Sequence, residues 1–345
     1  MKIRILACDG GGVRGIIPAV VLEYIEDQII EITKNPTARL SDFLDFGAGT
    51  STGSIISAMV MTPNEKGRPE YKMGEVVQAY FDLADVVFKK NFWRNLKTVW
   101  GVFGPKYNTK NIDDELLKKF DHWKLEDLLL PCAFTGYDTN KRRPNIYTNR
   151  DDKEKYGSYF VKDIVRGSTS IPSIFKPAYF RNGIDINTII DGGVFANNPS
   201  MVAYVEVTKT EELLTKHKVI NPTNMMFLSF GTGQGTLTPY PYRKVMRWGM
   251  LRWFFPILNI LLQGVGDVTT YEMGKLFEAY NSQDNFIRIN PPIVLGSTDG
   301  QDGSEKNMKH LHQDAINYVN ANKGFLRQIA QELINQDARY KTILF

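Results

Sequence analysis

The feature that most constrains the fold of this 345-residue chain is a unit that occurs twice, an apolar strand followed by a glycine-rich turn and a helix. In the first unit, residues 3–8 precede the turn, and apolar side chains recur at three- and four-residue intervals over 16–32. In the second unit, the run 43–46 precedes the turn and the apolar segment 54–61 follows it. Units of this kind build the parallel sheets of α/β proteins.

Four later segments have the composition of further strands, and they alternate with segments that favour helices. They are 132–138, 146–149, the segment that ends at Asp191, and 224–233. This alternation predicts an α/β fold with three layers, in which helices cover both faces of a central, mostly parallel sheet. Because the carboxyl ends of parallel strands share one edge, we expect functional loops to gather there.

The whole chain, 1–345, is predicted to form a single domain with a mixed polar and aromatic insertion at about 64–130, a cap or flank beside the sheet. Apolar residues make up 43% and charged residues 23%, as in ordinary globular proteins. The net charge of +4 permits an anionic surface as a partner, but it is too small to indicate a nucleic-acid polymer.

Cysteine usage and the apolar segments bear on the compartment. Cys8 and Cys132 lie among apolar neighbours, which predicts two buried thiols in a reducing environment and neither a disulfide nor a metal site. The first apolar run is too short for an export signal, and Pro256 and Asn259 interrupt the most apolar later segment. These features predict a cytoplasmic protein.

The first turn, residues 9–15, has the pattern GxGxxG and contains Gly10, Gly11, Gly12 and Gly15. Glycines let the backbone turn tightly and point N–H groups outward at the start of a helix, where the helix dipole favours negative charge. The turn therefore suits a phosphate or an oxyanion. A dinucleotide-binding protein would place an acidic residue at the end of a second strand about 20 residues further on, and this chain has helix and loop there.

The second turn has the pattern GxSxG, with Gly49, Ser51 and Gly53. A serine on a sharp turn between a strand and a helix N-terminus is typical of the exposed nucleophile of acyl hydrolases. The alternative is a tight glycine turn without catalytic chemistry. Ser51 is thus the candidate nucleophile.

A nucleophilic serine needs a base, and the histidines lie in segments typical of solvated surface. They are His122, His217, His310 and His312. Asp191 is the better candidate, since it ends an apolar run and precedes Gly192 and Gly193. A partly desolvated carboxylate within hydrogen-bond distance of the hydroxyl can take its proton directly. A plain Asp-Gly turn is the alternative.

Three segments in this order, DGGGVRG at 9–15, GTSTGS at 49–54 and DGGVFANNP at 191–199, resemble the patatin-like phospholipase family. The resemblance covers roughly residues 1–320 and includes the plant-patatin-like phrases LSDFLDFGAGTSTGSIISAMVM and LSFGTG, with STSIPSIFKP between the two candidate catalytic residues. It implies the patatin fold and a lipid acyl hydrolase of the phospholipase A or lysophospholipase type, without a metal, an organic cofactor or calcium.

For the site, the resemblance implies a Ser-Asp dyad that works without a histidine. Ser51 would be acylated, and Asp191 would act as general base. The backbone N–H groups of Gly11, Gly12 and Val13 would form the oxyanion hole, with Arg14 at the position of the family's basic residue. The substrates implied are glycerophospholipids and related acyl esters at a membrane surface.

Two alternatives concern the function as a whole. The chain could be a storage or binding protein that keeps the fold with incidental esterase activity. It could also be an effector that degrades membranes when a cyclic nucleotide activates it, as some bacterial members of the family are. The sequence contains no motif that decides between these and an unregulated hydrolase.

Two segments are candidates for contact with lipid. Residues 248–262 would form a wall or lip of the acyl channel, with an ordinary buried helix as the alternative. A cluster of cations between aromatic residues would rest on an anionic membrane, with a solvated flank as the alternative. Its members are Lys89, Lys90, Arg94 and Lys97 together with Phe88, Phe92, Trp93 and Trp100.

Overall fold

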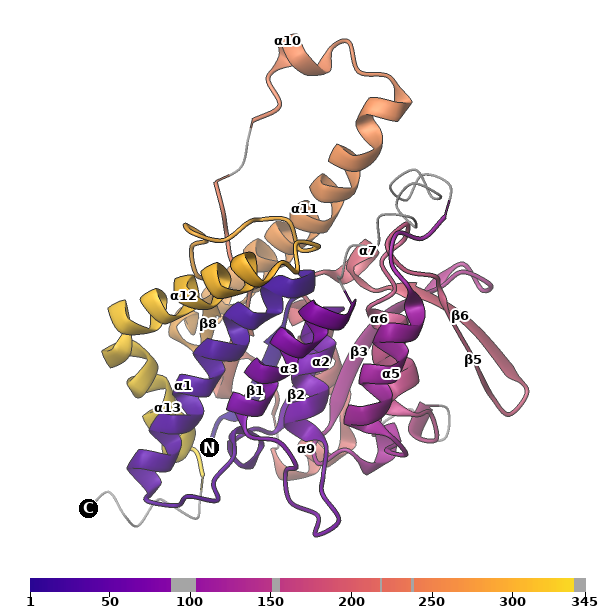
Figure 1. Cartoon of the computed structure of the whole chain (residues 1–345). Helices are drawn as coiled ribbons and strands as arrows, with labels where there is room; N and C mark the ends of the chain where they lie inside the picture. Colours follow the sequence, from indigo (N-terminus) through magenta and orange to yellow (C-terminus); the bar gives the residue numbers. More distant parts are fainter. Residues whose placement is uncertain (88–103, 151–155, 218, 237–238, 338–345) are drawn as a thin grey trace.

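The computed structural model has an eight-stranded sheet at its centre, with helices on both faces (Figure 1). It describes residues 1–87, 104–150, 156–217, 219–236 and 239–337. The predicted cluster of cations between 88 and 100 lies outside the described residues.

Five parallel strands form the larger part of the sheet. Their order across it is β3 (Cys132–Asp138), β2 (Phe46–Gly49), β1 (Ile3–Cys8), β7 (Met225–Phe230) and β8 (Phe286–Ile289). Beyond β3 the pairing becomes antiparallel, through β4 (Arg143–Thr148), β6 (Asp185–Asp191) and β5 (Ala178–Asn182). The prediction of a mostly parallel sheet between helical layers is confirmed.

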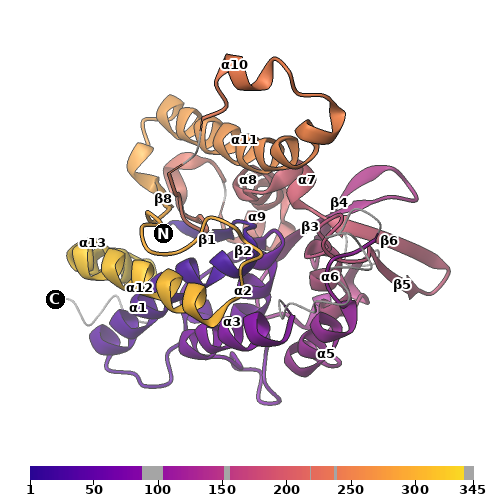
Figure 2. The same ribbon diagram turned by 45° about the horizontal axis from the view of Figure 1, so that its top comes forward.

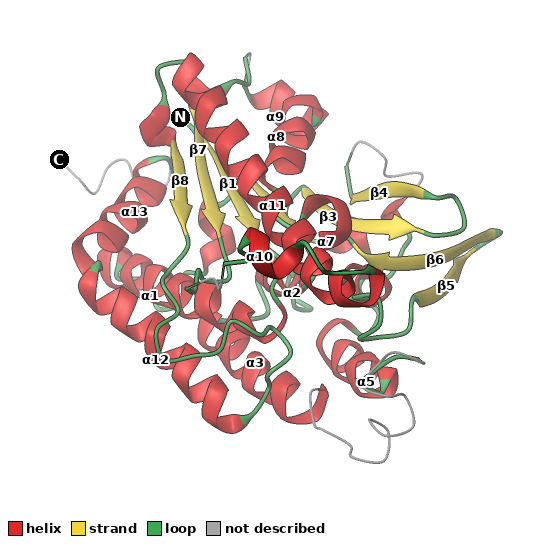
Figure 3. Ribbon diagram, turned by 90° about the horizontal axis from the view of Figure 1, so that it is seen from above, coloured by secondary structure: helices red, strands yellow, loops and turns green. Residues whose placement is uncertain are grey.

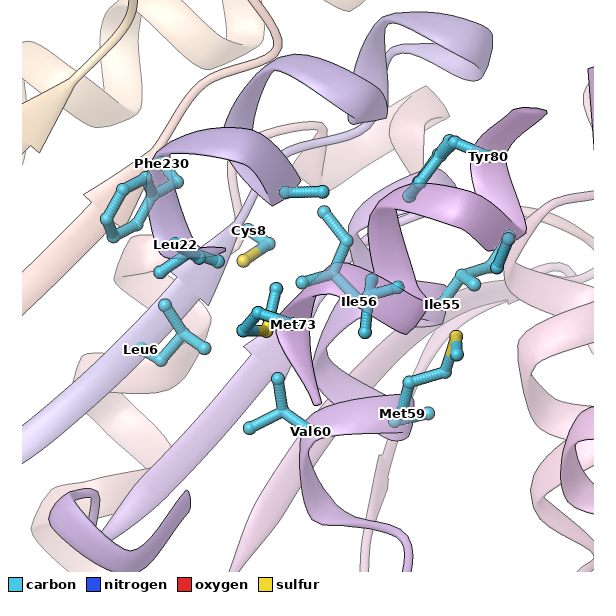
Figure 4. Close-up of a cluster of buried hydrophobic side chains, with 14 of the residues drawn as sticks. Leu6, Cys8, Leu22, Ile55, Ile56, Met59, Val60, Met73, Tyr80 and Phe230 are labelled. Atoms are coloured by element: carbon cyan, nitrogen blue, oxygen red, sulfur yellow. The ribbon is translucent and has the colours of Figure 1, made fainter. Parts of the chain in front are cut away.

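The side chains of β1 show how the sheet divides the core into two clusters. Leu6 and Cys8 face one layer of helices, and Ile3, Ile5 and Ala7 face the other, because side chains alternate along a strand. Figure 4 shows part of the first cluster, in which Leu6 and Cys8 are drawn beside Leu22 and Phe230. All five side chains are buried, on both faces of the strand, as expected for a strand at the centre of a parallel sheet.

Seven of the described helices cover the face of Leu6 and Cys8. They are α1 (Ile16–Thr33), α2 (Thr52–Met61), α3 (Met73–Val87), α5 (Thr109–Phe120), α6 (Val161–Ser168), α12 (Glu305–Ala321) and α13 (Lys323–Asn335). The opposite face is covered by α8 (Ser200–Lys209), α9 (Glu211–Lys216) and the C-terminal part of α11 (Met250–Ala279). The short α7 (Gly193–Ala196) and α10 (Tyr242–Val245) complete the described helices, and Figure 3 shows the layers from above.

The predicted elements agree with this architecture, with shifted bounds: the strand predicted at 146–149 is Arg143–Thr148, and the one predicted at 224–233 is Met225–Phe230. The second strand is Phe46–Gly49 and not 43–46, because Leu40–Phe43 forms a 3-10 turn before it. Cys8 and Cys132 are buried free thiols, as predicted. Within the described part of the chain, no helix combines the length and the apolar character that crossing a membrane requires.

Within the predicted insertion at 64–130, α3 packs directly against α1 and α5 packs against α6. Met73, Val76 and Tyr80 of α3 are buried in the main core cluster. The described part of this segment is therefore built into the helical layer. The prediction of a single domain with a cap or flank stays a prediction.

Candidate active site

Ser51 lies at the turn between β2 and α2, in the position that the GxSxG pattern predicts. Its backbone has φ 52° and ψ −124°, a conformation that a residue with a side chain adopts only when its surroundings impose it. The turn is tight because α2 starts close against β1: a Cβ at Gly53 would lie 2.0 Å from the carbonyl oxygen of Cys8. The sequence thus presents the hydroxyl at the carboxyl edge of the sheet.

The Ser51 hydroxyl donates a hydrogen bond of 2.6 Å to Oδ2 of Asp191. The other carboxylate oxygen, Oδ1, accepts a hydrogen bond of 2.7 Å from the backbone N–H of Gly193. Asp191 is 2% exposed, and burial raises its pKa from 3.8 to about 7, against the lowering effect of its two hydrogen bonds. The structure therefore brings the two predicted residues together, with a carboxylate whose pKa suits proton transfer near neutral pH.

The strand that carries Asp191 runs in the direction opposite to the expected one. The prediction placed it at the carboxyl end of a strand on the shared edge of a parallel sheet, but β6 runs antiparallel to β3. Because β4 occupies one side of β3 from Ala133 to Asp138, β2 and β6 share the other side, end to end. Gly49 is level with Phe134 and Asp191 with Gly136, so the two strands run toward each other and their ends meet.

The C-terminal end of α6 and the residues just after it hold the backbone of both residues. The hydroxyl of Ser168 accepts a hydrogen bond of 2.9 Å from the N–H of Ser51. The carbonyl of Ser170 accepts one of 3.0 Å from the N–H of Asp191, and Arg166 donates to the Ser170 hydroxyl. Sequence reasoning gave no role to these residues, although Ser168 and Ser170 belong to the phrase STSIPSIFKP, whose run of small polar residues at a helix end was the available signal.

The glycine loop 9–15 lies beside Ser51. A Cβ at Gly10 would be 3.2 Å from Cβ of Ser51, so the two backbones are in contact. The N–H of Gly10 donates to the carbonyl of Asn197, and the hydroxyl of Thr232 donates to the carbonyl of Gly10. Gly12 has φ +61°, in the left-handed region that favours glycine. The structure thus brings the predicted oxyanion loop to the predicted nucleophile.

One of the three predicted oxyanion donors is occupied by another part of the chain. The N–H of Val13 donates a hydrogen bond of 2.9 Å to the carbonyl oxygen of Gly300. A Cβ at Gly12 would lie 2.1 Å from the same oxygen, so the loop around Gly300 is packed tightly on the glycine loop. The Arg14 side chain turns back and donates through Nε to the carbonyl of Gly11 at 3.2 Å. Val13 could serve as a donor only if Gly300 released it.

A buried ion pair fixes the start of the glycine loop. Arg288 of β8 donates to both carboxylate oxygens of Asp9, at 3.0 and 2.5 Å, and to the hydroxyl of Ser229 at 2.9 Å. Sequence reasoning missed Arg288. The signal was a cation in the middle of the otherwise apolar run FIRI, since a charge in a buried strand needs a partner.

A cavity of about 40 Å³ lies next to Ser51 and the glycine loop. Gly12, Ser51, Thr52 and Thr169 line its polar end, and the rest of its wall is apolar or aromatic. The apolar wall consists of Val13, Ile55, Tyr80, Leu83, Val87, Ile112, Ile171 and Phe175. A serine nucleophile that opens into an apolar cavity suits a substrate with a hydrocarbon chain at its reacting carbon.

The other residues that the sequence singled out fall into two groups. Gly15, Gly49 and Gly192 lie in close backbone approaches at the edge of the site, against Thr52, Gly53 and Thr135 respectively. The four histidines lie elsewhere: His122 contacts the exposed Asp121, His217 follows α9, and His310 and His312 belong to α12. Among the described residues, no group of three or more His, Cys, Asp or Glu side chains could hold a metal ion.

The fold and the site together define a class: an α/β protein in which a strained serine at the carboxyl edge of the sheet is hydrogen-bonded to a buried aspartate beside a glycine loop. A family model for patatin-like phospholipases matches residues 6–204, more than half of the chain. The chain belongs to the patatin-like phospholipase family, and membership implies a lipid acyl hydrolase.

Curated relatives support the same assignment over nearly the whole chain. Patatin-T5 of Solanum tuberosum is 31% identical over 324 residues, which are 90% of this chain and 82% of that protein. Patatin-like protein 4 of Arabidopsis thaliana is 30% identical over 91% of this chain and 83% of its own length. Among solved structures, VipD from Legionella pneumophila aligns over 99% of this chain and 80% of its own, with a TM-score of 0.30 and 12% identity.

Proposed function

We propose that this chain hydrolyses fatty-acyl esters of glycerophospholipids through a Ser51–Asp191 dyad, as a phospholipase A or lysophospholipase. The observation that carries the proposal is the 2.6 Å hydrogen bond from the Ser51 hydroxyl to a buried carboxylate with a pKa of about 7. A carboxylate of ordinary pKa is too weak a base for a serine hydroxyl, and burial is what strengthens it.

In the first half of the reaction, Ser51 Oγ attacks the acyl carbonyl carbon, and its proton moves to Oδ2 of Asp191. The tetrahedral intermediate collapses, the bond to the alcohol oxygen breaks, and Asp191 returns the proton to that oxygen. In the second half, a water molecule gives its proton to Asp191 and attacks the acyl-serine. Ser51 then leaves with the proton, and the fatty acid is released. The hydrogen bond from Gly193 keeps the carboxylate in one orientation during both proton transfers.

The developing oxyanion is assigned to the backbone N–H groups of Gly11 and Gly12. These amides belong to the loop that touches Ser51, and the N–H of Val13 is engaged by Gly300. Donors that are fixed before the reaction stabilise the transition state without reorganisation, and each contributes about 3 kcal/mol. Arg14 holds the carbonyl of Gly11 and so helps to set the direction of the next amide.

The apolar cavity beside Ser51 supports an acyl chain as the group on the reacting carbonyl. Phe175 and Leu83 lie in its wall, where they would contact the acyl chain and exclude water from the acyl-enzyme. We further propose that the enzyme acts in the cytoplasm, at a membrane surface, where such esters are found.

The test is fatty-acid release from phospholipid vesicles and labelling by a fluorophosphonate. Ser51→Ala and Asp191→Asn should each lower release at least ~10³-fold, and Ser51→Ala should abolish labelling. His122→Ala is the control and should leave both unchanged, because no histidine takes part. Full release by either dyad variant would refute the mechanism. Wild type that neither labels nor turns over any ester would instead support a storage or binding protein.

A cyclic nucleotide as activator is tested in the same assay, by adding candidate nucleotides to wild type and to Ser51→Ala. A rise in release that depends on Ser51 would support control of the dyad. Equal rates with and without nucleotide would support an unregulated hydrolase. The same product analysis determines which acyl position and which head group the enzyme prefers.

A further inference from the structure

The segment 239–262 projects from the body of the protein as an arm, built from α10 and the N-terminal part of α11 (Figures 1 and 2). Its surface is unusually apolar for an exposed segment. Met250 is 86% exposed and Tyr242 is 76% exposed, and Met246, Ile257 and Leu261 are exposed as well. Exposed apolar side chains that gather in one place indicate a binding surface.

The charge of the arm has one sign. Between Gly231 and Gly266 the sequence has no aspartate or glutamate, whereas the arm carries Arg243, Lys244, Arg247 and Arg252. All four cations are exposed. Among the described residues, none of the ion pairs involves them. A surface with unpaired cations next to apolar groups complements an anionic lipid surface, because head groups attract the cations while the apolar side chains enter the acyl boundary.

Aromatic rings lie among the cations of the arm. Trp248 packs edge-on against Tyr240 at 5.4 Å and against Trp253 at 5.1 Å between ring centroids. Lys244 lies 6.0 Å from the ring centre of Trp248. Tryptophan and tyrosine prefer the interface between water and hydrocarbon, where an apolar ring and a polar edge are both accommodated.

The arm leads directly to the candidate active site. At its C-terminal end, Leu262 lies 3.0 Å from where a Cβ of Gly193 would be, and the N–H of Gly193 holds the Asp191 carboxylate. Ile260 and Leu261 line a groove of about 600 Å³ between α11 and the α7–α8 region. The arm therefore ends beside Gly193, whose N–H holds the carboxylate of Asp191.

We propose that residues 239–262 dock the protein on anionic lipid membranes, with Met246 and Met250 inserted and the four cations on the head groups. The biological role of this docking surface rests on the proposed function, but membrane binding and ester hydrolysis are measured separately. The arm also bears on the expectation for 248–262: the exposed side chains of Met250, Ile257 and Leu261 exclude an ordinary buried helix, and a wall or lip of the acyl channel stays a prediction.

The experiment is sedimentation of Ser51→Ala protein with phosphatidylcholine vesicles that contain 0 or ~30% phosphatidylserine. In that background, Met250→Glu should weaken binding to the anionic vesicles at least ~10-fold. Arg247→Gln with Arg252→Gln should weaken it ~30-fold, at about fivefold for each cation lost near the surface. Leu214→Glu on α9 and Lys323→Glu on α13 are the controls, on exposed positions outside the arm, and should not change binding.

Three outcomes would overturn the proposal: unchanged binding in the arm variants, an equal loss in the controls, or a protein whose oligomeric state changes with Met250→Glu without any change in vesicle binding. The last would assign the arm to a second copy of the chain. Hydrolysis of a short-chain monomeric ester by Met250→Glu with Ser51 intact should equal that of wild type. If wild type fails on that ester while its vesicle binding follows the expected pattern, the proposed function fails and the docking surface stands.

Discussion

Asp191→Asn should make the protein inactive and, above neutral pH, more stable. The physical reason is that burial raises the pKa of this carboxyl from 3.8 to about 7. In the unfolded chain the group ionises near its ordinary pKa, so between these two values the folded state binds the additional proton. The free energy of unfolding therefore falls as pH rises through this window, and the loss is complete above about 7.

The size of the effect follows from the two pKa values. Their difference corresponds to about 4 kcal/mol of destabilisation at pH 8 and to about 2 kcal/mol at pH 5. An asparagine carries no charge and avoids this destabilisation. Its carbonyl oxygen can accept the hydrogen bond from Gly193, and its NH₂ can donate to the Ser51 oxygen. The Asp191→Asn protein should therefore be more stable than wild type by up to about 4 kcal/mol at pH 8, and by less at pH 5.

Urea unfolding followed by tryptophan fluorescence at pH 5, 6.5 and 8 measures the effect. Ser51→Ala is the control, because it keeps the buried carboxylate and removes one of the hydrogen bonds that lower its pKa. It should gain no stability at pH 8. Equal unfolding free energies of wild type and Asp191→Asn at all three pH values would refute the reasoning, as would a wild-type kcat/KM that stays level from pH 8 down to pH 5 instead of falling tenfold per unit below about 7.

Three further changes test the surroundings of the dyad. Gly12→Ala places a Cβ 2.1 Å from the carbonyl oxygen of Gly300, at a residue with φ +61°, so kcat should fall ~100-fold. Gly67→Ala is the control, because Gly67 has φ +69° and open space around it. It should cost only about 1 kcal/mol of stability and leave activity unchanged. Ser168→Ala removes the acceptor of the Ser51 N–H and should lower kcat ~10-fold with KM unchanged, and Ser168→Thr should restore it. Arg288→Gln leaves Asp9 buried without its ion pair and should lower the unfolding free energy by about 3–5 kcal/mol, of which a second change, Asp9→Asn, should recover a large part.

Local pattern was sufficient to predict the sharp turn at Ser51 and the glycine loop. The turn at Ser51 needs glycines at fixed positions beside it, and the loop 9–15 follows an apolar strand. Both features are therefore determined by a few neighbouring residues. The apolar run before Asp191 likewise indicated a strand end. Its direction was not predictable, because whether β6 runs parallel or antiparallel to β3 depends on pairing between segments about 50 residues apart.

The contacts that hold the glycine loop were beyond sequence reasoning for a related reason. Asp9 and Arg288 are 279 positions apart in the sequence. Val13 contacts Gly300 through a backbone N–H and a backbone carbonyl, and a contact between backbone groups does not depend on residue type. Such contacts depend on how β7 and β8 pack beside β1 and on how the loop near 300 folds over the turn. The hydrogen bond from the N–H of Val13 to Gly300 could therefore not be anticipated from the sequence.

The glycine loop depends on a part of the chain that lies beyond the family-model match at 6–204. Thr232 donates to the carbonyl of Gly10, Arg288 pairs with Asp9, and the carbonyl of Gly300 accepts the N–H of Val13. Each of these three contacts fixes a different point of one short turn, and all three partners come from residues after 204. Ser51 and Asp191 belong to the matched region, whereas these three contacts to the glycine loop come from outside it. Changes after residue 204 should therefore act on transition-state stabilisation as well as on the stability of the fold.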